Sequence, residues 1–196
     1  DTCTIREPEY TEETYTISDS REGWVKSVQI LLDGFFFGKK IPIFDYSVIR
    51  PAGEPILGFG GTSSGHGPLE ELHNALKELY TPIIGKKITS VDIVDTENLI
   101  GRCVVAGNVR RSAALALGQH DDRDYLTMKN DQEKLYNHRW GSNNSFEAKV
   151  GMDYTWHAGQ SQKNGEPGYI WLENARTRGR MKDGYRDDDL KVMGFN

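Results

Sequence analysis

The stretch GRCVVAGNVRRSAALALG, residues 101–118, sets the expectation for the whole fold. It contains the apolar end of a helix expected over residues 91–105 and a strand expected over residues 113–117. Gly107 and Asn108, between the two, are residue types that tolerate a positive φ and let another backbone or a ligand come close. The sequence therefore predicts a helix, a tight turn and a strand in succession, as is typical of an α/β protein.

The turn in this stretch carries two adjacent arginines, Arg110 and Arg111. A guanidinium is a planar fork of donors that suits a phosphate, a carboxylate or the edge of a base. A solvated turn with no ligand is the alternative, and this stretch considered alone favours that alternative. The choice between a ligand-binding turn and a solvated turn therefore depends on the other stretches of the sequence.

A second informative stretch, residues 50–67, is rich in glycine and small hydroxyl residues. A helix over residues 68–80 follows it, and Pro68 suits the first turn of that helix. Backbone N–H groups at such a junction can bind an anion. Known phosphate loops do not match, because His66 stands where the P-loop needs lysine and Ser63 where the dinucleotide fingerprint needs its third glycine. Composition alone favours a flexible surface loop.

The remaining chain alternates expected helices and strands. Residues 1–18 are expected to form an arm or linker, and Asp19 is expected to cap a helix over residues 20–36, with Glu22 three residues on as in a capping box. Strands are expected over residues 41–47, 142–146 and 168–173. The second of these strands reads SNNSF, and its polar side chains are typical of a strand that lines a polar cavity, with an exposed turn as the alternative.

Composition and charge narrow the classes of function. The chain has 196 residues, enough for one domain or a piece of a larger one, and 24 basic against 29 acidic residues give a net charge of −5. This balance disfavours a purely electrostatic nucleic-acid binder. No apolar run approaches the ~20 residues of a membrane span, and the first 20 residues do not resemble a signal peptide. We therefore expect a cytoplasmic protein with neither a nucleic-acid nor a membrane partner.

Cysteine and histidine spacing indicates no metal site. Cys3 and Cys103 are the only cysteines, so there is neither a disulfide framework nor a C-x-x-C motif. The five histidines show no spacing typical of metal ligands. Cys103, on an expected helix, is interpreted as a buried structural cysteine.

Six stretches, taken together, resemble one protein family. They read DSREGWV (residues 19–25), RPAGEPILGFGGTSSGHGPL (50–69), AGNVRRSA (106–113), DQEKLYNHRWGSNNS (131–145), NGEPG (164–168) and GFN (194–196). In this order they resemble the catalytic subunit of ribonucleotide reductases, and most closely the adenosylcobalamin-dependent, class II ribonucleoside-triphosphate reductases. They span nearly the whole chain, and only residues 1–18 match poorly.

The resemblance implies a fold and a set of binding residues. The family fold is a ten-stranded α/β barrel, of which residues 19–196 would form about half, with effector loops at about residues 50–67 and 106–112. A deoxynucleoside triphosphate effector would have Arg50 at its phosphates and would be bound by Arg50, Gly53, Gly60, Gly61, Gly107, Asn108 and Arg111. The ribonucleotide substrate would contact Arg110, Ser142 and Asn196, with Arg110 reaching toward its base.

The chemistry of the family needs a radical cysteine, a pair of reducing cysteines and a glutamate, and the radical cysteine lies in a segment Asn-Pro-Cys-Gly-Glu. This chain ends at Asn196, the asparagine of that motif, and neither Cys3 nor Cys103 lies in a matching context. The hypothesis is that residues 1–196 alone, as a fragment or a split-gene product, do not reduce ribonucleotides. The complete enzyme would use adenosylcobalamin, the remaining half of the reductase and a thioredoxin-type reductant. The alternative is a stand-alone, non-catalytic nucleotide-binding or scaffold module.

Overall fold

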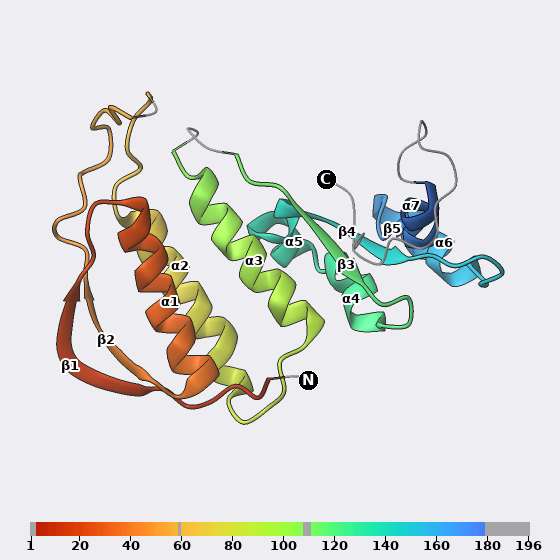
Figure 1. Ribbon diagram of the computed structural model, residues 1–196, viewed down its shortest axis with the longest axis horizontal. Coiled ribbons are helices and arrows are strands. Elements are labelled where there is room, and N and C mark those ends of the chain that lie inside the picture. Colours follow the sequence, from red (N-terminus) through yellow and green to blue (C-terminus); the bar gives the residue numbers. More distant parts are fainter. Residues whose placement is uncertain (1–2, 59, 108–110, 179–196) are drawn as a thin grey trace. The chain divides into compact units, whose positions relative to one another are not determined.

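The computed structural model describes residues 3–58, 60–107 and 111–178. The chain divides into two compact units, Asp1–Ser112 and Ala113–Asn196 (Figure 1). Three of the predicted site residues, Asn108, Arg110 and Asn196, lie outside the described residues.

The first unit is a βαβ arrangement followed by two further helices. Strand β1 (Glu9–Thr16) leads through helix α1 (Arg21–Phe37) to strand β2 (Lys40–Asp45), and the two strands pair in parallel. The remaining elements are helix α2 (Gly67–Tyr80), the short 3-10 helix η1 (Thr81–Ile83) and helix α3 (Ser90–Val105). Helix α2 contacts both α1 and α3, so the three helices pack in chain order (Figure 1).

Helix starts in this unit follow from side chains that satisfy the first backbone N–H groups. Ser20, rather than the expected Asp19, caps α1, because its Oγ accepts a hydrogen bond from the Gly23 N–H at 3.1 Å. Thr89 and Asp92 form a full capping box at the start of α3. The expected helix bounds are confirmed to within a residue or two, whereas the capping role of Asp19 was wrong.

The core of the first unit includes the N-terminal residues that were expected to form an arm or linker. Ile5 and Ile17, on either side of β1, are 1% and 0% exposed. The Ile17 N–H donates to the Asp45 carbonyl oxygen and the Ile5 N–H to that of Lys86, both at 2.9 Å. Burying an isoleucine side chain stabilises a fold by roughly 1.5–3 kcal/mol, so this segment contributes to the stability of the unit.

The second unit is built on a parallel sheet of three strands in the order β3-β4-β5. The strands are β3 (Ala114–Gly118), β4 (Ser142–Glu147) and β5 (Gly168–Ile170). The helices around them are α4 (Arg123–Thr127), η2 (Met128–Asn130), α5 (Gln132–Asn137), η3 (Arg139–Gly141), α6 (Thr155–Asn164) and α7 (Leu172–Arg178). Helices lie in each connection, since parallel strands need a crossover.

The last expected strand, residues 168–173, is shorter in the structure. Strand β5 ends at Ile170 and helix α7 begins at Leu172. Leu172 and Ala175, nearly one helical turn apart, are both buried, which is helical rather than strand spacing. The expected extension to Glu173 was therefore wrong, because a short apolar run does not distinguish a strand from the start of a helix.

The expected α/β class is confirmed in a coarser form than the sequence suggested. Over the described residues the two sheets are separate and open, with two and three strands. A complete barrel requires a sheet that closes on itself, so the described residues show the α/β class, and the half barrel stays a prediction. Among the described helices, none is long and apolar enough to cross a membrane.

Candidate functional site

A pocket of about 290 Å³ lies in the first unit where three segments meet. The start of α1, the glycine-rich segment after β2 and the end of α3 each form one side. Residues from the three sides include Asp19, Trp24, Arg50, Ser64, Cys103 and Val104. Ala106, the first residue of the second expected effector loop, also lines the pocket. The pocket is therefore bounded by both of the expected effector loops.

Arg50 and Asp19 face each other in this pocket. The Arg50 Nε donates to Oδ2 of Asp19 at 2.6 Å, and its Nη1 donates to the Pro55 carbonyl oxygen at 3.4 Å. Both side chains of the ion pair are about one-third exposed, at 34% and 32%. A partly exposed pair contributes roughly 0–1 kcal/mol. An anion with several charged oxygens can therefore displace the carboxylate and bind the guanidinium in its place.

The glycine-rich segment is held in a defined shape by its own backbone. The Gly53 N–H donates to the Ser63 carbonyl oxygen at 2.9 Å, and the Ser63 N–H donates to the Glu54 carbonyl oxygen at 2.7 Å. Gly60 and Gly61 turn the chain with φ of 73° and 85°, a conformation that other residues rarely adopt. We call residues 53–63 the glycine-rich hairpin. Its three predicted binding glycines shape the hairpin and are not among the residues that line the pocket.

The second expected loop approaches the first at Gly107. This residue has φ of 85°, and a Cβ built on it would lie 3.3 Å from the Cβ of Ser64, a pocket residue. Arg111, on the far side of the turn, is exposed and is not among the lining residues. The structure thus brings Arg50, Ser64 and Gly107 to one place, and binding by Arg111 stays a prediction.

Most of the residues that line the pocket, among them Asp19, Trp24 and Cys103, were not among the predicted site residues. Asp19 was expected to cap a helix and Cys103 to be structural. Burial raises the pKa of the Cys103 thiol to about 11, so at neutral pH it is protonated and unreactive. The motif DSREGWV contains both Asp19 and Trp24, and its place in the family resemblance was the signal that could have pointed to them.

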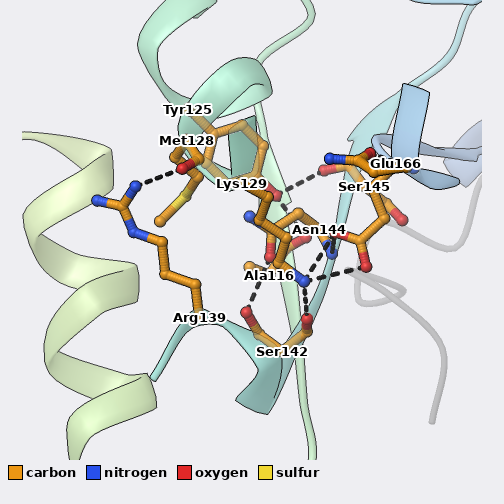
Figure 2. A network of polar contacts seen from close by, with 10 residues as sticks. Ala116, Tyr125, Met128, Lys129, Arg139, Ser142, Asn144, Ser145 and Glu166 are labelled. Carbon is orange, nitrogen blue, oxygen red and sulfur yellow. Dashed lines mark hydrogen bonds and ion pairs between the residues drawn. The ribbon is translucent and has the colours of Figure 1, made fainter. Parts of the chain in front are cut away.

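The polar strand β4 of the second unit forms a separate network (Figure 2). The Lys129 Nζ donates to the Ser142 carbonyl oxygen and lies 2.8 Å from Oε2 of Glu166. The same carboxylate accepts a hydrogen bond from the Asn144 N–H at 3.2 Å. The Lys129 side chain is 9% exposed and that of Glu166 is 23% exposed. A buried lysine is thereby held between a carboxylate and a backbone carbonyl.

Two hydroxyl groups complete this network (Figure 2). The Tyr125 hydroxyl lies 2.7 Å from the Ala116 carbonyl oxygen and 2.9 Å from that of Ser145, so it bridges strands β3 and β4. Burial raises the pKa of Tyr125 and keeps it a donor. Ser142, which is 3% exposed, donates its hydroxyl to Oδ1 of Asn144 at 2.8 Å. Apart from the buried Nδ2 of Asn144, which has no hydrogen-bond partner among the described residues, these groups satisfy one another, which indicates a structural polar core. A substrate contact by Ser142 stays a prediction.

Comparison with known proteins connects the pocket-bearing unit to one family. The family model "B12-dependent ribonucleotide reductase, insertion domain" matches residues 4–80, which contain α1 and the glycine-rich hairpin. A crystal structure of a B12-dependent, class II ribonucleotide reductase superimposes with a TM-score of 0.79 and 41% identity over 91% of this chain. The chain corresponds to a portion of a class II ribonucleotide reductase. The family recognised from the six sequence motifs is thereby confirmed.

Curated relatives show how large that portion of the reductase is. A probable adenosylcobalamin-dependent ribonucleoside-triphosphate reductase of Dictyostelium discoideum is 48% identical over 185 residues, which are 93% of this chain and 24% of the relative. The adenosylcobalamin-dependent reductase of Euglena gracilis is 44% identical over 98% of this chain and 27% of its own length. The chain therefore spans about a quarter of the length of the reductases it matches.

Neither candidate site of this reductase portion fits the cobalamin cofactor named in those relatives. The pocket of about 290 Å³ is far smaller than a corrin ring with its ligands, and the network in the second unit is filled by its own side chains. Across residues 3–58, 60–107 and 111–178, no group of three or more His, Cys, Asp or Glu side chains could hold a metal ion. Adenosylcobalamin is named for the relatives, and neither of these two sites shows a place for it.

Proposed function

We propose that this chain binds a deoxynucleoside triphosphate effector in the pocket of its first unit, as the effector-binding and substrate-side portion of a class II ribonucleotide reductase. The observation that carries the proposal is the meeting of Arg50, the glycine-rich hairpin and Gly107 at one pocket. The relatives are ribonucleoside-triphosphate reductases by name, so a nucleotide is the ligand class that their activity supplies.

The walls of the pocket suit the two ends of a nucleotide. Arg50, once released from Asp19, offers a fork of donors to phosphate oxygens. Trp24 and Val104 offer apolar surface to a base or sugar. The volume of about 290 Å³ is at the lower end of the ~300–1,000 Å³ usual for ligand sites. Part of the triphosphate would therefore lie at the mouth of the pocket.

The second loop, residues 106–112, would report on the effector. Because Gly107 lies against Ser64, the residue directly after the glycine-rich hairpin, a ligand that shifts this end of the hairpin also favours one arrangement of the second loop. Arg110 is proposed to reach the substrate base, with Asn108 and Arg111 on the effector side. Ser142 and Asn196 remain the proposed substrate contacts.

In the complete reductase we propose the conversion of ribonucleotide to deoxyribonucleotide by thiyl-radical chemistry inside the barrel of the family. The cytoplasmic enzyme would use adenosylcobalamin as radical source, a thioredoxin-type reductant and the remainder of the reductase. Neither Cys3 nor Cys103 lies in the radical-cysteine motif. We therefore expect no deoxynucleotide formation by residues 1–196 alone, and a direct assay of product formation would detect any.

Calorimetric titration with each of the four deoxynucleoside triphosphates tests the effector site. We expect binding by the chain and, in Arg50→Ala, a loss of about 1.5–3 kcal/mol of binding free energy, since a charge-assisted phosphate contact is removed. Lys40→Ala is the matched control, because it removes one positive charge from the same unit at an exposed pair with Glu9. Equal affinities of Arg50→Ala and Lys40→Ala would remove Arg50 from the site.

The alternative, a stand-alone nucleotide-binding or scaffold module, predicts the same titration. The two functions separate when the remaining part of a reductase is added to the chain. Deoxynucleotide formation that responds to Arg50→Ala supports the reductase portion. Nucleotide binding without any activity in the reconstituted protein supports the stand-alone module.

A further inference from the structure

A directed chain of hydrogen bonds crosses the core of the first unit next to the pocket. His73 on α2 is 0% exposed, and its two ring nitrogens face different elements. Nε2 lies 3.1 Å from the Ser27 Oγ on α1, and Nδ1 lies 2.7 Å from the Tyr46 hydroxyl, just after β2. Ser27, also 0% exposed, donates its hydroxyl to the Trp24 carbonyl oxygen at 2.8 Å. One imidazole thus connects three segments of the unit.

The number of available protons fixes which group donates in each hydrogen bond of this series. Because the single hydroxyl proton of Ser27 goes to the Trp24 carbonyl, the Ser27 Oγ must accept from His73. His73 therefore carries its proton on Nε2, and Nδ1 accepts from the Tyr46 O–H. Burial lowers the pKa of His73 to about 4, with Lys77 adding to the effect, so the imidazole is neutral at physiological pH. A neutral ring with this one tautomer satisfies all of the bonds.

One end of this series of hydrogen bonds, Trp24, lines the α1 wall of the pocket, and the other end, Tyr46, begins the segment that leads to Arg50 on another wall. Tyr46 opens a turn that the Ile49 N–H closes by donating to the Tyr46 carbonyl oxygen at 3.0 Å, and Arg50 is the next residue. At the other end, Trp24 lies in the first turns of α1 and lines the pocket. With these hydrogen bonds intact, the Arg50 guanidinium lies beside Asp19, at 2.6 Å.

An apolar ring would fill the same space without linking the walls. The His73 ring already stacks on Phe44, with centroids 4.5 Å apart, so packing alone does not require a polar side chain there. Burying a polar group costs free energy unless it forms hydrogen bonds. A fully hydrogen-bonded side chain also fixes the positions of its partners, whereas an apolar side chain only fills the space. The arrangement is therefore suited to setting a distance between walls.

We propose that His73 is a positioning residue for the pocket, which acts through Tyr46 on Arg50 and through Ser27 on the start of α1. This inference rests on the proposed function for the identity of the ligand, and on the contacts alone for the positioning. His73 does not touch the ligand, so its effect on binding passes through Arg50.

The variant Tyr46→Phe tests this role, because it removes one hydroxyl and keeps the ring. Tyr80→Phe is the matched control. Tyr80 is the last residue of α2, the helix that carries His73. It is 0% exposed, and its hydroxyl contacts Thr96 Oγ1 at 2.6 Å. We expect Tyr46→Phe to weaken deoxynucleoside triphosphate binding about threefold to tenfold, the effect of one hydrogen bond, and Tyr80→Phe to leave it unchanged. In an Arg50→Ala background, Tyr46→Phe should have no further effect on affinity.

Amide hydrogen exchange measures the positioning in the absence of ligand. In Tyr46→Phe we expect the Ile49 N–H, which closes the turn before Arg50, to exchange about threefold to tenfold faster, and in Tyr80→Phe to exchange as in the unmodified chain. Unchanged exchange at Ile49 would overturn the inference whether or not the chain binds nucleotide. Affinity lost equally with and without Arg50 would also overturn it. If the unmodified chain binds no nucleotide, the proposed function fails, and the exchange result alone decides on His73.

Discussion

Replacing Lys129 by methionine tests whether the polar network of the second unit is structural. Lys129→Met keeps a long, flexible side chain and removes the charge that lies 2.8 Å from Glu166 and donates to the Ser142 carbonyl oxygen (Figure 2). The Glu166 carboxylate would keep only the Asn144 N–H, at 3.2 Å, among the contacts described for it within the network. A buried acceptor and a largely buried carboxylate would then be left short of donors.

The expected loss of stability in Lys129→Met follows from how far Lys129 and Glu166 are buried. Breaking a buried ion pair by removing one partner costs about 3–5 kcal/mol. Glu166 is 23% exposed and retains one donor, so we expect a loss of about 2–3 kcal/mol in the free energy of unfolding. Making the carboxylate neutral as well, in Lys129→Met with Glu166→Gln, should recover at least about 1 kcal/mol, because the uncompensated charge is gone.

Urea unfolding followed by tryptophan fluorescence is the appropriate assay, since three of the four tryptophans, Trp140, Trp156 and Trp171, lie in the second unit. Lys163→Met is the control, because Lys163 lies in the same unit and donates to Gln160 at an exposed site. A loss below about 0.5 kcal/mol in Lys129→Met, typical of surface changes, would refute the reasoning. The reasoning would also be refuted if the double variant lost as much free energy of unfolding as Lys129→Met and Glu166→Gln lose separately, added together.

Two further predictions concern the first unit. The pKa of His73 is about 4, below the ordinary 6.5, so between these pH values the folded state binds fewer protons than the unfolded state. The free energy of unfolding should therefore rise between about pH 4 and 6.5, by up to about 3 kcal/mol. This rise should be smaller in His73→Gln. Denaturant titrations at several pH values check it, and an equal slope in both proteins would contradict it. Ser20→Ala should cost about 1 kcal/mol of stability through the lost cap of α1, whereas Asp19→Ala should cost at most about 0.5 kcal/mol. Equal losses in the two variants would restore Asp19 as the cap.

Local sequence signals predicted the helices well and the polar contacts poorly. The early Pro68 is a local signal, and the helix that it begins was placed to within a residue. The cap of α1 was misassigned because Asp19 and Ser20 are adjacent and both good caps. In the structure Ser20 accepts from the Gly23 N–H, whereas Asp19 binds Arg50, 31 positions away.

The polar contacts that escaped prediction depend on partners that are distant in the sequence. Lys129 and Glu166 are 37 positions apart, and His73 meets Ser27 across 46 positions. No periodicity or spacing rule connects such pairs, since their proximity is set by how helices and strands pack. The family resemblance did indicate Arg50 and the glycine-rich segment, because those motifs are contiguous in the sequence. The same resemblance included the motif with Asp19 and Trp24, but only the fold shows that these two residues line the same pocket as Arg50.

The walls of the pocket come from residues 19–25, 50–64 and 103–106, nearly the full length of the first unit. A site assembled from both ends of a unit exists only while the whole unit is folded. Any ligand of this pocket must therefore stabilise the unit as a whole, by about 2.7 kcal/mol at a hundredfold excess over its Kd. Occupancy and folding thus become one equilibrium, and a cell that runs short of the ligand would hold this segment closer to its unfolding threshold.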